Sequence, residues 1–124
     1  PLTFMFNFKK DEFNFPVSGV LFQNFIDKLI PSIKKFGFVE VILESSSSKI
    51  PSNNYTRNEV LSFDRLQKTK SEILKAMAQK GFNPLRIIFT EERILVQGPE
   101  IKVNTNSIDQ FNDYDYIKVI PKTL

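Results

Sequence analysis

The chain has 124 residues, of which 41% are hydrophobic and 25% charged, and it contains neither histidine nor cysteine. Without imidazole or thiol groups, the sequence excludes thiolate nucleophiles, histidine-activated serines, zinc sites built from Cys and His, and disulfides. The net charge of +3 is mild, so it permits a polyanionic partner without requiring one.

The length and the balanced composition predict a single globular domain over residues 1–124. Its core should be rich in aromatic rings, because the chain contains 13 Phe and 3 Tyr but no Trp. No apolar run reaches the length of about 20 residues that spans a bilayer, and the N-terminus lacks the pattern of a secretion signal. We therefore expect a cytoplasmic protein that has no membrane partner.

The chain begins with a strand pattern. In Leu2–Phe8 every second residue is large and apolar, so these side chains share one face and the residues between them share the other. This alternation is typical of a strand. Phe13 and Phe15 follow in a short extended piece or loop that should bury both rings.

A first helix comes next. Ser18 is a candidate N-cap, the apolar residues that follow recur every three or four positions up to Phe36, and Gly37 is a candidate C-cap. Pro31 removes one helical amide, so the sequence predicts a kink or a division of this helix.

A second strand and a loop follow the first helix. Phe38–Glu44 alternates in the manner of a strand whose second face is partly buried. Residues 45–55 contain four consecutive serines and show no periodicity. The sequence therefore predicts a mobile loop over residues 45–55.

The second helix should be longer. Thr56 and Glu59 have the spacing of a capping box, so we expect a helix from Arg57 to Lys80. Ser62 could divide it into two.

Beyond Pro84 the apolar period becomes two. We expect strands at Leu85–Thr90, Arg93–Gln97, Glu100–Asn104 and Tyr114–Ile120, with turns at Glu91-Glu92 and Gly98-Pro99. Amphipathic helices that follow the first two strands must cover an apolar sheet face. The sequence therefore predicts an α/β (α+β) fold, a two-layer sandwich in which two main helices cover one face of a mixed sheet of about five strands.

Binding to nucleic acid is the first functional hypothesis. Its candidate residues are Lys9, Lys10, Lys34, Lys35, Arg65, Lys68 and Lys75. The last three form a row along the second helix together with Glu72, and a solvated charged face is the alternative explanation of that row. In its order of elements the chain resembles small chromatin and RNA-binding proteins of the Alba type, and that resemblance implies RNA or DNA as the partner.

The second hypothesis is a protein-interaction module within a larger assembly. Two helices on one side of the sheet leave its other face to water or to a partner. We place Met5, Ile42, Tyr114 and Tyr116 on that face, because aromatic and large apolar side chains suit a protein interface or self-association.

An enzymatic alternative depends on Pro1. A free N-terminal proline is a secondary amine, which can act as a general base when burial lowers its pKa. The order of the elements resembles the tautomerase superfamily, which uses such a proline, and Lys34, Lys35 and Arg86 are the available cations.

We expect neither a metal nor a cofactor. Asp109, Asp113 and Asp115 lack the ligand and glycine pattern of an EF-hand. We therefore interpret the chain as a non-enzymatic binding domain that acts on a protein or a nucleic acid through its open sheet face and a basic helix face.

Overall fold

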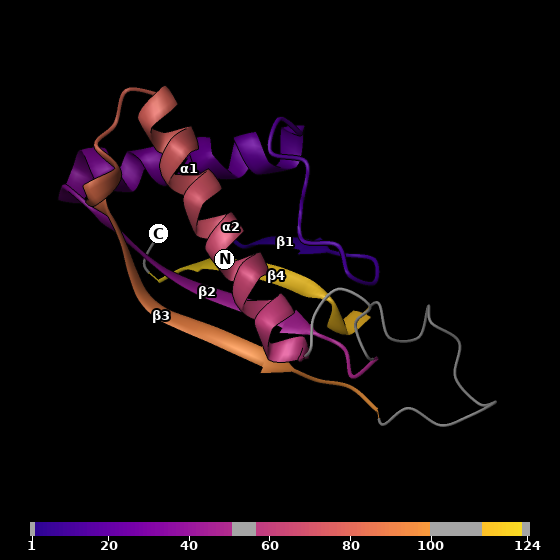
Figure 1. The fold of residues 1–124 in the computed structure, drawn as a ribbon. Coiled ribbons are helices and arrows are strands. Elements are labelled where there is room, and N and C mark those ends of the chain that lie inside the picture. The colour runs from indigo at the N-terminus through magenta and orange to yellow at the C-terminus, as the bar shows by residue number, and fades with distance from the viewer. Residues whose placement is uncertain (1, 51–56, 100–112, 123–124) are drawn as a thin grey trace.

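The computed structural model describes residues 2–50, 57–99 and 113–122. These residues form two α-helices, one short 3₁₀ helix and four strands (Figure 1). In chain order the elements are β1 (Phe4–Asn7), α1 (Val20–Phe36), β2 (Val39–Ser47), α2 (Asn58–Gln79), η1 (Pro84–Arg86), β3 (Ile87–Val96) and β4 (Tyr116–Pro121).

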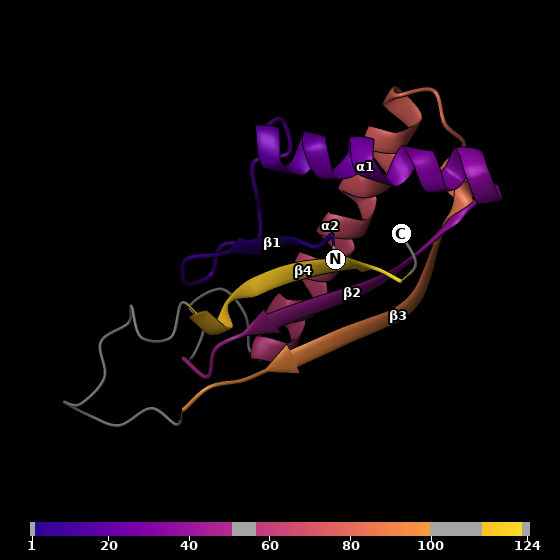
Figure 2. The ribbon, with the colours of Figure 1, turned by 180° about the vertical axis from the view of Figure 1, so that it is seen from behind.

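The four strands form one mixed sheet in the order β1-β4-β2-β3. Strand β4 is antiparallel to both β1 and β2, whereas β2 and β3 are parallel and are connected through α2. Both helices lie on the same side of the sheet, as Figures 1 and 2 show from opposite directions. The predicted two-layer sandwich with a mixed sheet is therefore confirmed, although the described residues form four strands and not about five.

The strand count differs because Glu91-Glu92 is not a turn. Strand β3 runs without interruption through both residues, and its register shifts opposite Val41, so that Thr90 forms a bulge. Glu92 lies beside α2, since its carboxylate is 3.3 Å from the Nζ of Lys70. A bulge absorbs one extra residue without reversing the chain. The further strand expected at residues 100–104 lies outside the described residues.

Helix α1 matches its prediction closely. It begins after Gly19 instead of Ser18, and the amide of Gly37, at φ +85°, closes its end on the carbonyl oxygen of Ile33 at 2.8 Å. Pro31 lies within one continuous helix of 17 residues, on its exposed side, so the chain is not divided there.

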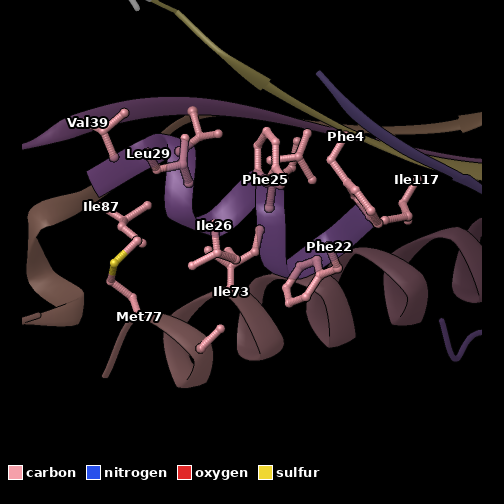
Figure 3. Packing of buried hydrophobic residues seen from close by; sticks show 14 of the residues in the cluster. Phe4, Phe22, Phe25, Ile26, Leu29, Val39, Ile73, Met77, Ile87 and Ile117 are labelled. Atoms are coloured by element: carbon pink, nitrogen blue, oxygen red, sulfur yellow. The ribbon is translucent and has the colours of Figure 1, made fainter. Parts of the chain in front are cut away.

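The helices and the sheet enclose a core that has an aromatic half and an aliphatic half (Figure 3). The Phe4 ring lies 5.3 Å from that of Phe22 and 5.8 Å from that of Phe15, in the tilted arrangements that aromatic rings prefer. Ile26, Leu29, Ile73 and Met77 fill the other half. One prediction fails here, because the Phe13 side chain is 39% exposed while Phe15 is buried.

The serine run after Glu44 is part of the sheet. Strand β2 continues to Ser47, so the expected mobile loop does not begin at residue 45, and residues 51–56 lie outside the described part of the chain. The predicted capping residue Thr56 is among these. Helix α2 begins at Asn58 and passes through Ser62 without a break.

Candidate functional site

A buried polar cluster occupies the carboxyl end of β2. The last strand residues and the residue that follows are all buried serines: Ser45, Ser46, Ser47 and Ser48. The Oγ of Ser47 donates to the carbonyl oxygen of Asn58 at 2.9 Å and lies 2.8 Å from the Oγ of Ser62. Ser62 in turn lies 2.7 Å from the carbonyl oxygen of Leu95. These bonds connect β2 with the first turns of α2 and with the end of β3.

Arg65 lies beside this cluster and is fully buried. Its Nη1 is 2.8 Å from Oδ1 of Asp115, and the two side chains are 0% and 4% exposed. The same nitrogen donates to the carbonyl oxygen of Ser46 at 3.1 Å, while Nε and Nη2 donate to those of Glu12 and Lys9 at 2.6 and 3.3 Å. One side chain of α2 therefore holds the turn after β1, the end of β2 and the start of β4.

Asp115 completes this arrangement from the other side. Its Oδ1 accepts the amide of Ser48 at 3.1 Å, and its carbonyl oxygen accepts the amide of Phe8 at 2.7 Å. The Phe8 ring in turn lies 4.5 Å from the guanidinium carbon of Arg65. Because a buried charge is costly unless it is paired and hydrogen-bonded, this set of contacts fixes the positions of the segments around it.

Accessible polar groups surround the same end of the sheet. The side chain of Arg57, just before α2, is 73% exposed and lies 3.6 Å from the carboxylate of Glu59. The Arg57 side chain, at the N-cap position, makes no capping hydrogen bond to the first turn of α2. Asn58 instead donates to the carbonyl oxygen of Ile50 at 3.0 Å. The positive end of the α2 dipole and the Arg57 guanidinium lie at this end of the sheet, and the Glu59 carboxylate partly balances their charge.

The predicted basic row on α2 is not one surface. Arg65 belongs to the interior, so its expected place on a solvated face is wrong. Lys68 and Lys75 are accessible, but both lie near the carboxylate of Glu72, at 3.2 and 3.7 Å. Their charges are therefore partly balanced within the helix.

The other predicted basic residues lie at opposite ends of β2. Lys9 and Lys10 are in the turn after β1, next to the buried cluster, whereas Lys34 and Lys35 are in the last turn of α1, just before β2 begins. The structure does not bring the basic candidates together. At the end of α1 the two lysines favourably complement the helix dipole.

The predicted interface residues are divided between the open face and a loop. Met5, Ile42 and Tyr116 alternate with residues that face the helices, so they point to the opposite side of the sheet. Met5 is 44% exposed, but Tyr116 is only 8% exposed. Tyr114 precedes β4 and packs its ring against Gly98.

Tyr116 is part of a hydrogen-bonded network on the open face. Its hydroxyl donates to Glu44 at 2.6 Å and accepts from Gln97 at 3.0 Å. Arg93 binds Glu44 at 3.1 Å and Glu91 at 2.8 Å. The open face is therefore largely a network of paired charges and not a bare apolar surface.

The network changes the acidity of its members. Burial tends to raise the pKa of Glu44, but hydrogen bonds from Tyr116 and Arg93, with the charges of Lys118 and Arg93, lower it below its usual value. Burial and the hydrogen bond to Glu44 raise the pKa of Tyr116. The hydrogen bond from Arg93 lowers the pKa of Glu91.

The remaining chemical candidates do not form a site in the described residues. Pro1 lies outside them, and Arg86 donates to the carbonyl oxygen of Gly37 at 3.3 Å. Asp109 also lies outside, Asp113 is exposed, and Asp115 is paired with Arg65. Within the described ranges, no group of three or more acids could hold a metal ion.

Sequence reasoning missed Asp115, the buried serines and the Glu44 network. One signal was present for Arg65, since it lies four residues after Leu61 and eight before Ile73, on the buried side of α2. No comparable signal marks its partner Asp115, which is 50 residues further along the chain.

Comparisons with known proteins give similarity in structure only. No protein-family model matches the sequence, and no curated protein matches it. The peptidoglycan-associated lipoprotein of Burkholderia pseudomallei is similar in fold, with a TM-score of 0.54 and 11% identity over 95% of this chain and 89% of that one. The periplasmic domain of Helicobacter pylori MotB has a TM-score of 0.50 and 14% identity over 98% of this chain and 81% of that one. At these identities the matches show the fold.

These matches correct the functional predictions. Two proteins share the fold. One is named for its association with peptidoglycan, and the other is a periplasmic domain. The prediction of nucleic-acid binding is therefore wrong, and so is the tautomerase alternative, whereas the coarser prediction of a binding module fits these matches. The expected cytoplasmic location is wrong for the same reason. No helix within the described ranges has the length and apolar character needed to cross a membrane.

Proposed function

We propose that this chain is a cell-envelope domain that associates with peptidoglycan. The observation that carries the proposal is the extent of the fold match to the Burkholderia pseudomallei lipoprotein, which covers 95% of this chain and 89% of the other. The match to a periplasmic domain supports the same compartment. The match accounts for nearly the whole of both chains, so the shared part is a complete sandwich and not an isolated motif.

The carboxyl end of β2 is the part of the domain best suited to such a ligand. In α/β sheets, ligands bind outside the carboxyl ends of parallel strands, and β2 and β3 form a parallel pair with α2 between them. The stem peptides of peptidoglycan carry carboxylates. Arg57 is 73% exposed although it pairs with Glu59, and together with the positive end of the α2 dipole it supports binding of a carboxylate here.

The buried cluster beneath this surface has a positioning role. Arg65 is inaccessible to a ligand, but it holds the end of β2 against the start of β4 through Ser46 and Asp115. A rigid support of this kind keeps the accessible groups in place at little entropic cost on binding.

Co-sedimentation with purified, insoluble peptidoglycan tests the proposal. We expect the wild-type chain to sediment with the polymer, and Arg57→Glu to weaken binding by roughly tenfold, the scale of one charge-assisted hydrogen bond. Lys34→Glu is the matched control, since it makes the same change of charge at the other end of β2 and should bind normally. If the wild-type chain stays in the supernatant at low salt, the proposal is wrong. If both variants bind equally well, the ligand is bound elsewhere.

A further inference from the structure

An apolar tip lies at the amino end of β2, opposite the proposed peptidoglycan site. It consists of four large side chains that are strongly exposed: Phe36 at 58%, Phe38 at 42%, Leu85 at 83% and Ile88 at 43%. They come from the end of α1, the link into β2, the 3₁₀ helix η1 and the start of β3. These segments meet at one end of the molecule, on the right of Figure 2.

Direct contacts hold these segments together. Arg86 of η1 donates from Nη1 to the carbonyl oxygen of Gly37 at 3.3 Å. Val39 and Ile87 are register partners in β2 and β3 and are 2% and 5% exposed, so they anchor both strand starts in the core. Ile88, which follows Ile87 in β3, points to the face of the sheet opposite the helices. The apolar tip is therefore a fixed part of the fold.

The charges beside the tip have one predominant sign. Lys34, Lys35 and Arg86 are all exposed, and the Nζ of Lys35 lies 5.1 Å from the centroid of the Phe36 ring. The acid closest in the sheet is Glu40, which is half-buried and lies opposite Ile88. Exposed rings beside lysines and an arginine are the composition of surfaces that lie in the headgroup layer of an anionic membrane.

We propose that the apolar tip inserts into the interface of an anionic lipid membrane. Phe36 on a helix end and Leu85 on a short turn are the most exposed of its side chains, and a fluid lipid surface accommodates protruding groups without a complementary pocket. Large apolar side chains exposed at one end of a domain are typical of an interaction surface. This proposal departs from the expectation that the chain has no membrane partner, which rested on the lack of a membrane-spanning run, and interfacial binding does not require such a run.

The tip and the proposed peptidoglycan site are at opposite ends of the same strand. Nine strand residues separate them by about 25 to 30 Å, at about 3.3 Å per residue. Both surfaces are therefore free to act at the same time. The membrane proposal goes beyond the proposed function and does not rest on it.

Sedimentation with lipid vesicles tests the apolar part of the proposal. The wild-type chain should bind vesicles of phosphatidylcholine mixed with phosphatidylglycerol, and should bind pure phosphatidylcholine much more weakly. Phe36→Ser with Leu85→Ser should weaken binding by tenfold or more. Val20→Ser with Leu21→Ser is the matched control, since these residues are 72% and 78% exposed at the other end of α1.

Charge reversal tests the electrostatic part independently. Lys34→Glu with Lys35→Glu should weaken binding to the anionic vesicles by about tenfold or more, given the attraction of each cation to such a surface. Lys68→Glu with Lys75→Glu changes the net charge equally on α2 and should have a much smaller effect. Circular dichroism establishes that each variant is folded.

Two results would overturn the proposal. One is the absence of wild-type binding to anionic vesicles at low salt. The other is a self-association that depends on concentration, is lost in the Phe36 and Leu85 variant and occurs without vesicle binding, which would assign the tip to a contact between copies of the chain.

Discussion

Replacing Asp115 by alanine should destabilise the domain by about 3 to 5 kcal/mol, because it removes the counter-ion of a fully buried guanidinium. Arg65 would keep its bonds to the carbonyl oxygens of Ser46 and Glu12, but neutral acceptors do not balance a buried charge. The amide of Ser48 would lose its acceptor as well. Domains of this size have a total stability of about 5 to 15 kcal/mol, so the loss would be a large part of it.

Urea unfolding followed by circular dichroism measures this loss. With a slope of about 2 kcal/mol/M, the midpoint should fall by about 1.5 to 2.5 M. Asp115→Asn retains an acceptor for Arg65 and Ser48, and should cost less than the alanine variant. Asp113→Ala, at an exposed neighbouring position, should stay within about 0.5 kcal/mol of wild type. A midpoint shift below about 0.5 M for Asp115→Ala would refute the view that this ion pair holds the segments together.

Two further predictions concern the open face and a crowded glycine. Tyr116→Phe should raise the pKa of Glu44, measured by NMR of its carboxyl carbon, because one of the hydrogen bonds that lower it is lost. A carboxyl group whose pKa is lower in the folded than in the unfolded state stabilises the fold at pH values above its unfolded-state pKa. That stabilisation is lost as the pH falls through the folded-state pKa, so the Tyr116→Phe variant should lose less of its stability on acidification. A pKa of Glu44 that does not move would contradict this reasoning. Gly98→Ala should cost about 1 to 3 kcal/mol, since its φ is +103° and a Cβ would lie 2.8 Å from the Tyr114 ring. Gly81→Ala, at φ +87° and with no atom near the added Cβ, measures the cost of the backbone conformation alone. If both variants lose the same stability in thermal unfolding, the Tyr114 ring moves aside without cost.

The elements that could be predicted are those in which burial follows a local period. The stripe that ends at Phe36 predicted α1 to within two residues at its start, because apolar groups three and four residues apart must share a helix face. The strand at Phe4–Asn7 was predicted from its alternation. In both elements the side chain alone determines which face is buried.

The serine run at the end of β2 could not be predicted from a local pattern. Serine has no strong preference for a strand, and four in succession resemble a loop. Ser47 is buried in β2 because Asn58 and Ser62 of α2 satisfy its hydroxyl, and those partners are 11 and 15 residues away. The information that makes the segment a strand therefore lies in the helix that covers it.

Arg65 shows the same limit for a charged residue. A lysine or arginine on a helix is usually solvated, and the spacing of Arg65 to Lys68 and Glu72 fits a surface row. Its burial requires Asp115, which enters the site only when β4 pairs with β2 across the sheet. A pair of this kind depends on the tertiary fold, so one sequence without its relatives cannot reveal it.

The composition of β2 changes along its length, and its two halves contribute differently to the fold. In its first half Val39, Val41 and Leu43 are buried in the apolar core. In its second half the buried side chains are serines, whose burial contributes little: Ser47 has bonded partners, whereas the Ser45 hydroxyl has none among the described residues. An apolar residue of similar size at position 47 would add apolar burial. It would also remove the hydrogen bond between the hydroxyls of Ser47 and Ser62. The serine half therefore contributes mainly by fixing α2 and the end of β3 against β2, while the apolar half supplies most of the burial.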